Sequence, residues 1–107
     1  MRLSALATLF LTVSAGFGIA AGDATAGKAA YDKSCKSCHG AEGAPNPGMA
    51  KAMKVDMKAL SSSEVQGTSD ADLKKIITDG KGKMKPVKSV AGKDIDNVIA
   101  YVRSLKK

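Results

Sequence analysis

Both cysteines and the single histidine of this 107-residue chain fall in one short stretch, KSCKSCHG, from Lys33 to Gly40. A cysteine pair with two intervening residues can form a disulfide, but a thioredoxin-like site would need a βαβ pattern, which this sequence lacks. A plain disulfide stays open as an alternative. A structural zinc site needs four ligands, so a carboxylate would have to join Cys35, Cys38 and His39. Neither use explains why the histidine directly follows the second cysteine.

A third use of the cysteine pair does explain the histidine. C-x-x-C-H is the attachment signature of c-type haem, in which the thiols bond to the haem vinyl groups and the next residue offers an imidazole to the iron. Here the motif uses every Cys and His of the chain and leaves no spare thiol. We therefore predict one haem c, attached covalently through Cys35 and Cys38, with His39 as an axial ligand of the iron.

The N-terminus has the layout of a secretory signal. Arg2 is followed by an uncharged, mostly apolar run over residues 3–21. Cleavage is expected either near Ala20, Ala21 and Gly22 or after the triplet Ala24-Thr25-Ala26, and the triplet is slightly favoured for its A-x-A form. An uncleaved anchor is the alternative, because the run approaches the length of a spanning helix. No other segment is apolar enough to span a membrane.

The sequence thus predicts a signal peptide over 1–26, a single periplasmic domain over 27–107 and no membrane span after cleavage. This domain has little material for a core, since its aromatic residues are Tyr31 and Tyr101 and it has no tryptophan. Domains this small bury a modest fraction of their surface and usually need an additional stabilising element, such as a disulfide or a bound metal. A large apolar group such as haem would complete the core, so we expect haem binding and folding to be coupled.

Helical periodicity predicts an all-α domain with helices over about 27–39, 49–60, 69–80 and 92–105. Ser69 and Asp72 resemble a capping box with Asp in the Glu position, and Gly80 ends that helix. The last helix has no side-chain cap at Ala91, although Asp94 places negative charge in its first turn. The stretch GAEGAPNPG, 40–48, is predicted to be an irregular loop because it is dense in Gly and Pro.

The formal net charge of +7 favours a partner or surface of negative charge. Nucleic acid is a poor candidate, because the lysines are not interleaved with stacking aromatic residues and an exported protein does not meet it. Many of the lysines lie in the segment KGKMKPVKSV, 81–90, which reads as a loop around one Met and one Pro.

The chain resembles the small single-haem class I cytochromes c of bacteria. The resemblance runs from AGKAAYDKSCKSCHG through SDADLKKIITDGKGKM to DIDNVIAYVRSL and covers essentially the whole mature chain. It implies the cytochrome c fold, in which about four short helices wrap around one covalently attached haem. It also implies that the N- and C-terminal helices cross, with Gly27, Tyr31 and Tyr101 at the crossing.

In this family a methionine from the loop between the last two helices binds the iron opposite the histidine. The resemblance implies that Met84 is this ligand, although Lys85 separates it from Pro86 where the family often has Met-Pro directly. The competing methionines have an i, i+4 spacing that is more simply explained as an apolar helix face; they are Met49, Met53 and Met57. The family's histidine N–H is held by a proline carbonyl, for which Pro47 is preferred over Pro45.

With both axial positions filled, the expected function is one-electron transfer between redox proteins by a monomer that is not an enzyme. The lysines beside the ligand loop, which are Lys81, Lys83, Lys85 and Lys88, would orient an acidic partner, unless they are merely a solvated loop. Two alternatives stay open. One is a haem-bearing subunit or tethered module of a larger redox complex. The other is a sensor or enzyme that binds a small ligand if Met84 is not a stable ligand.

Overall fold

The computed structural model describes residues 22–107, so residues 1–21 of the signal peptide predicted over 1–26 lie outside the described residues. The helices, in chain order, are α1 Ala24–Ser34, α2 Lys36–His39, the 3₁₀ helix η1 Ala41–Gly43, α3 Pro47–Met53, α4 Ser63–Gln66, α5 Asp70–Asp79 and α6 Lys93–Ser104. Within this range the only extended pairing is an isolated bridge between Lys81 and Met84. The predicted all-α class is confirmed. None of the helices in the described range reaches the length and apolarity that a bilayer crossing requires.

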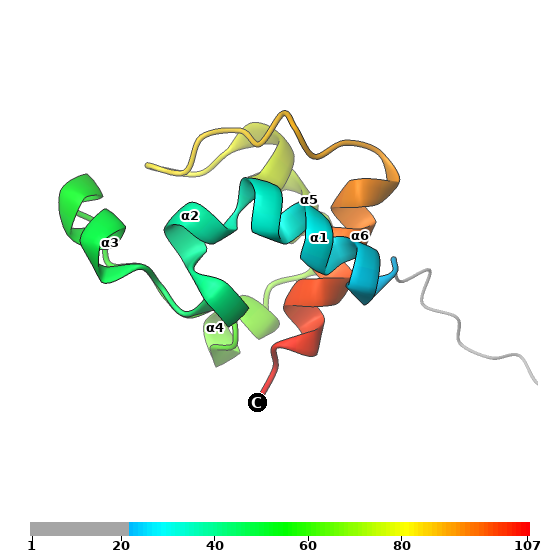
Figure 1. The fold of residues 1–107 in the computed structure, drawn as a ribbon, viewed down its shortest axis with the longest axis horizontal. Coiled ribbons are helices and arrows are strands. Elements are labelled where there is room, and N and C mark those ends of the chain that lie inside the picture. The colour runs from blue at the N-terminus through cyan, green and yellow to red at the C-terminus, as the bar shows by residue number, and fades with distance from the viewer. Residues whose placement is uncertain (1–21) are drawn as a thin grey trace, which may run out of the picture.

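The first and last helices cross, as predicted. α1 lies across α6 (Figure 1). The backbones of the two helices approach closely at Gly27, where a Cβ would lie 1.8 Å from the carbonyl oxygen of Asn97. The rings of Tyr31 and Tyr101 pack beside this point with centroids 5.0 Å apart and planes tilted by 55°. Glycine is therefore required at position 27, because any side chain there would push the two helices apart.

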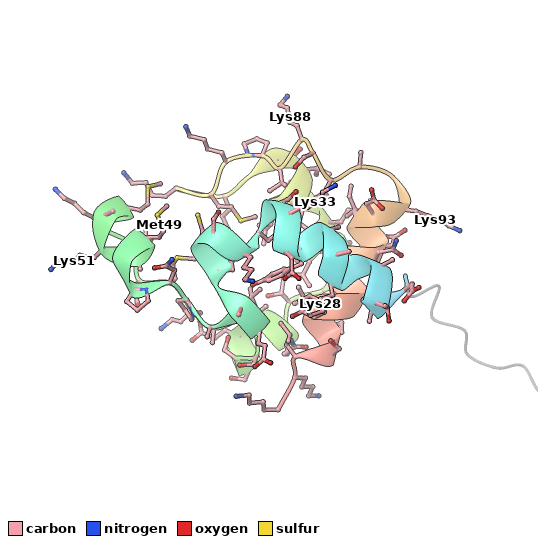
Figure 2. All side chains as sticks on the ribbon, in the orientation of Figure 1. Lys28, Lys33, Met49, Lys51, Lys88 and Lys93 are labelled. Carbon is pink, nitrogen blue, oxygen red and sulfur yellow. The ribbon has the colours of Figure 1, made fainter. Side chains whose placement is uncertain are left out.

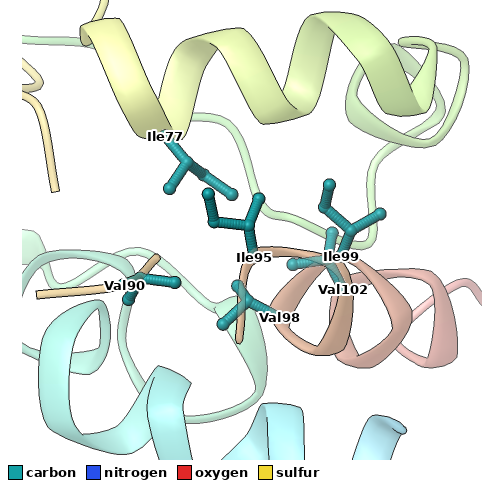
Figure 3. Close-up of a cluster of buried hydrophobic side chains, with 6 residues drawn as sticks. All are labelled: Ile77, Val90, Ile95, Val98, Ile99 and Val102. Carbon is teal, nitrogen blue, oxygen red and sulfur yellow. The ribbon is translucent and has the colours of Figure 1, made fainter. Parts of the chain in front are cut away.

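A cluster of buried aliphatic side chains fills the space between α5 and α6 (Figure 3). Its members come from α5, from the loop before α6 and from α6 itself; they are Ile77, Val90, Ile95, Val98, Ile99 and Val102. Ile77 points from α5 toward Ile95 on α6. Burial of each such side chain contributes about 1.5–3 kcal/mol, and four of the six lie on α6, so the last helix supplies most of the cluster.

The boundaries of α5 and α6 agree with the sequence prediction. The Ser69 hydroxyl accepts a hydrogen bond of 3.1 Å from the backbone N–H of Asp72, and Gly80 follows the last residue of α5. α6 begins after Gly92 without a side-chain cap. Near its end, Arg103 donates to the Asp70 carboxylate at 2.7 Å and to the Gln66 carbonyl at 2.9 Å, which ties α6 to the start of α5.

The first predicted helix is interrupted, which the sequence did not indicate. α1 ends at Ser34, and Cys35 has φ −123° and ψ −29° before α2 begins. α1 also starts three residues earlier than predicted, at Ala24, with Asp23 as its N-cap. The interruption gives the segment that ends in His39 its own direction, beside α1 in Figure 1. No Gly or Pro stands at position 35, so no local signal predicts the break.

The second predicted helix, over 49–60, was placed wrongly. α3 spans Pro47–Met53, so it begins inside the segment predicted to be an irregular loop and ends well before Leu60. Pro47 occupies the first helical position, where proline is favourable, and the Asn46 side chain caps it. The helix ends because Lys54 adopts the left-handed conformation, with φ 53° and ψ 47°. The short helix α4 was not predicted.

Candidate cofactor site

A cavity of about 520 Å³ brings together predicted site residues from two segments that are far apart in the sequence. Its walls include Cys35, Cys38 and His39 from the α1–α2 segment and Met84 from the loop before α6. A second cavity of about 320 Å³ is also lined by Cys35, His39 and Met84, and it reaches the aliphatic side chains of α5 and α6. The predicted attachment residues and the predicted methionine ligand therefore face the same apolar space.

The cysteines and the histidine lie on these walls in a half-buried state. Cys35 and Cys38 carry free thiols, and burial, aided by the nearby Cys38, raises the pKa of the Cys35 thiol to about 11. Burial lowers the pKa of His39, which favours the neutral imidazole that binds metals. The His39 Nδ1 atom is buried and finds no hydrogen-bond partner among the described residues. The protein therefore leaves this ring nitrogen without a hydrogen bond.

A tight turn directly after His39 fixes the end of α2. Gly40 has φ 74°, and a Cβ at this position would lie 1.8 Å from the carbonyl oxygen of Ala44. Its N–H donates to the Lys36 carbonyl at 2.8 Å, and its carbonyl accepts a hydrogen bond of 2.6 Å from the Tyr31 hydroxyl. The histidine is therefore held between a turn that only glycine can make and a buried tyrosine of α1.

A second tight turn presents Met84. The N–H of Met84 donates to the Lys81 carbonyl and the N–H of Lys81 donates to the Met84 carbonyl, both at 2.9 Å. Gly80, with φ 80°, precedes this turn, and a Cβ there would lie 2.5 Å from the Met84 oxygen and 2.9 Å from Pro86. The backbone of Met84 is thus anchored to the end of α5, and Pro86 packs on Gly80 although Lys85 separates it from Met84.

Two of the three competing methionines share the larger cavity with Met84. Met53 and Met57 line it, whereas Met49 is not among its lining residues. Met49 and Met53 lie on α3, but Met57 lies beyond the end of that helix. The apolar-face interpretation of all three methionines was therefore wrong for Met57, because the chain leaves the helical conformation at Lys54.

The hydrogen bond from the His39 imidazole to the Pro47 carbonyl, which the family resemblance implies, is not formed among the described residues. Pro47 is the first residue of α3, and the His39 Nδ1 atom has no hydrogen-bond partner among residues 22–107. The neighbouring Asn46 instead joins the loop to α2, since its N–H donates to the Cys38 carbonyl at 3.1 Å and its side-chain amide donates to the Ser37 carbonyl at 3.3 Å. An Asn before a Pro is an N-cap signal that sequence reasoning passed over.

Comparison with known proteins agrees with this geometry. A family model described as "Cytochrome C oxidase, cbb3-type, subunit III" matches residues 22–102. Cytochrome c-554(547) of Halothiobacillus neapolitanus is 36% identical over 97 residues, covering 80% of this chain and 100% of that protein. The chain belongs to the c-type cytochromes. The solved structure of the KustC0563 c-type cytochrome matches at a TM-score of 0.63 and 27% identity, over 76% of this chain and 98% of that chain.

A c-type cytochrome carries covalently bound haem, and the residues present fit such a group. The cavity walls combine two free thiols, a neutral imidazole with an unpartnered nitrogen and a thioether. The aliphatic side chains of α5 and α6 line the adjoining cavity and would cover an apolar face of the macrocycle. Thioether and imidazole are both established haem ligands.

Lysines surround the larger cavity of this cytochrome. The four predicted from the loop line it, and they are joined by a fifth from a distant segment: Lys81, Lys83, Lys85, Lys88 and Lys58. Figure 2 shows Lys88 extending outward from the loop. Lys58 pairs with Asp56 at 3.4 Å, an exposed contact that contributes little. Sequence reasoning missed Lys58 because nothing in its local segment places it beside the others.

Proposed function

We propose that this c-type cytochrome is a periplasmic one-electron carrier between redox proteins, with iron held by His39 and Met84. The observation that supports the proposal most is the convergence of Cys35, Cys38, His39 and Met84 on one cavity. In this assignment Cys35 and Cys38 would hold the haem covalently through their thiols, and the His39 imidazole and the Met84 thioether would bind its iron. The bound haem would supply an iron centre that takes up and releases one electron.

Each protein group has a separate task in this proposal. The two thioether bonds hold the macrocycle in place, so that the ligands need not retain it. The buried aliphatic residues exclude water from the site, and hydrophobicity around an iron centre is one of the factors that set its potential. A thioether ligand raises the potential relative to two imidazoles. With both axial positions taken by protein, no position remains for a substrate, so we propose that the cytochrome is not an enzyme.

The lysines around the larger cavity would orient an acidic redox partner toward it. Charged groups at the rim of an interface mainly change the association rate, and salt screens this effect. We expect the electron-transfer rate to an acidic partner to fall as ionic strength rises, and Lys58→Gln to lower it at low salt. Lys93 at the start of α6 does not line the cavity, so Lys93→Gln is the matched control. Equal rates at low and high salt would argue against steering.

The first experiment is the optical spectrum of the oxidised protein, purified from a host that attaches haem to exported chains. Covalent haem together with the weak far-red band of Met sulfur on ferric iron supports the His/Met centre. Met84→Ala should abolish the band while haem stays attached. Because Met53 and Met57 also line the cavity, Met53→Ala and Met57→Ala are the essential controls, and both should keep the band. Loss of the band in either of these variants would assign the ligand to that methionine instead.

A second candidate function is a haem-bearing subunit of a larger redox complex. It is favoured by the family match, since that family is described as a subunit of a cytochrome c oxidase. Size-exclusion chromatography of the protein expressed in its own host distinguishes the two functions. A monomeric elution supports the carrier, and co-elution with membrane redox subunits supports the complex.

A further inference from the structure

Asn97 of α6 contacts the N-terminal segment at several points ahead of residue 27. Its side-chain oxygen accepts a hydrogen bond of 2.8 Å from the N–H of Asp23. A Cβ on Gly22 would lie 2.3 Å from the Asn97 nitrogen, and one on Gly27 would lie 1.8 Å from the Asn97 oxygen. Gly22 and Asp23 are therefore held against α6, although Asp23 itself stays exposed.

Asp23 also begins the first helix. Its carboxylate accepts a hydrogen bond of 2.8 Å from the N–H of Thr25, and its carbonyl accepts one of 2.8 Å from the N–H of Gly27. Its backbone is extended, with φ −84° and ψ 117°, as an N-cap residue requires. The first turn of α1 therefore depends on Asp23, and the triplet Ala24-Thr25-Ala26 lies within that turn.

The two candidate cleavage sites have different consequences for this arrangement. A cut after Ala26 would remove the cap residue, the first turn of α1 and both contacts that Gly22 and Asp23 make with Asn97. It would also place the new α-ammonium on Gly27, which is buried at the crossing. A positive charge there would be desolvated and would face the positive end of the α1 dipole. A cut before Gly22 avoids each of these costs, and a cut directly before Asp23 keeps the cap and the first turn and loses only the Gly22 contact.

We propose that a signal peptidase cleaves this chain before Asp23, within Ala20-Ala21-Gly22, so that the mature cytochrome keeps Asp23 as the cap of α1. Water adds across one peptide bond, which leaves a carboxylate on the released signal and an amine on the mature chain. The small residues Gly18 and Ala20 have the spacing that such a peptidase selects. The proposal rests on the export that is part of the proposed function, but not on electron transfer.

The test is the N-terminal sequence and intact mass of the haem-loaded protein from the periplasm. An N-terminus at Ala21, Gly22 or Asp23 supports the proposal, and one at any later residue overturns it. A chain that keeps residues 1–21 would also overturn it, while the far-red band would still report separately on the proposed electron carrier.

Variants at Ala26 and Asp23 test the proposal further, beyond the N-terminal sequence of the parent protein. Ala26 is exposed on α1, so Ala26→Gln would block a cut after residue 26 without disturbing the core. We expect an unchanged N-terminus and yield, and a shift or loss of processing would overturn the proposal.

Asp23→Ala in the mature haem-loaded protein should raise the unfolding equilibrium constant roughly fivefold, which is the usual effect of losing an N-cap. Asp23→Asn keeps the cap and should leave this constant nearly unchanged. Equal constants for Asp23→Ala and the parent would overturn the role of Asp23.

Discussion

The hydroxyl of Tyr31 donates a hydrogen bond of 2.6 Å to the carbonyl oxygen of Gly40, the residue directly after His39. This bond joins the helix crossing to the turn that ends the attachment segment. Tyr31 is 1% exposed, and its ring packs on Tyr101. The packing of α1 on α6 and the position of the histidine are therefore coupled through one side chain.

Tyr31→Phe should lower the free energy of unfolding by about 1–2 kcal/mol, because the ring stays but the half-buried Gly40 carbonyl loses its donor. Denaturant unfolding of the haem-loaded protein measures the change. Tyr31→Leu also removes the ring contact with Tyr101 and should cost more. If Tyr31→Phe matched the parent protein, the hydrogen bond would contribute nothing.

The same phenol should make stability depend on pH in the alkaline range. Burial is the main cause that raises the pKa of Tyr31 above its ordinary value, so the folded protein disfavours the phenolate. The stabilisation is fully present below the ordinary phenol pKa of about 10 and is lost as pH rises above it toward the folded-state pKa. We expect the unfolding midpoint to fall over this range, and to fall less in Tyr31→Phe. Parallel pH curves for the two proteins would contradict this assignment.

Gly27→Ala should destabilise the protein by about 1–3 kcal/mol or more, because the added methyl would overlap the Asn97 carbonyl at the helix crossing. Thermal unfolding monitored by circular dichroism measures the loss. Gly48→Ala is the matched control, since it adds a methyl in α3 whose nearest neighbour is 3.4 Å away. A similar small effect at both positions would show that the crossing can open to admit a side chain.

Gly80→Ala should disturb the presentation of Met84. Glycine has φ 80° there, and the added methyl would lie 2.5 Å from the Met84 oxygen. Gly82→Ala is a close control, because Gly82 also has a positive φ, 56°, but has nothing within 4 Å of the added methyl. Both variants carry the conformational cost of about 1–2 kcal/mol, and only Gly80→Ala should weaken the far-red band. Equal bands in the two variants would contradict the proposed anchoring.

Removal of haem should leave the chain largely unfolded. The cavity of about 320 Å³ is lined by Ile77, Val98, Ile99 and Val102 of the core cluster, and without the macrocycle these aliphatic side chains would face water. Circular dichroism and thermal unfolding of Cys35→Ser/Cys38→Ser protein, expressed without haem attachment, measure this. A full helical signal with a cooperative transition would show that the side chains alone suffice.

The parts of the fold that local signals determine could be predicted from the sequence. The α5 cap at Ser69, its end at Gly80 and the stripe of α6 all depend on residues within one or two turns of each other. The break at Cys35 could not be predicted, because the residue has ordinary propensity and its conformation comes from packing. The displaced α3 has a different cause, since Pro47 was interpreted as a helix breaker when its position after Asn46 favours a helix start.

The candidate site also has parts that local sequence patterns predict and parts that depend on how distant segments fold together. The C-x-x-C-H spacing is a local pattern, and the three residues that it singles out line one cavity in the structure. The contribution of Lys58 and Met57 to that cavity depends on how the segment after α3 folds back, which no local pattern in the sequence specifies. Met84 was predicted through a family resemblance, and the structure gives the physical basis of its position in the turn after Gly80.

The contact between Asp23 and Asn97 spans 74 positions of the chain, and this bears on the order of events during biogenesis. α1 finds its main packing partner in α6, so on the export route that we propose the chain has no complete core until α6 has also crossed the membrane. Contacts of such long sequence separation also form late once the chain is free. In that proposal the C-x-x-C-H segment reaches the far side of the membrane in an open chain, with both thiols accessible for haem attachment.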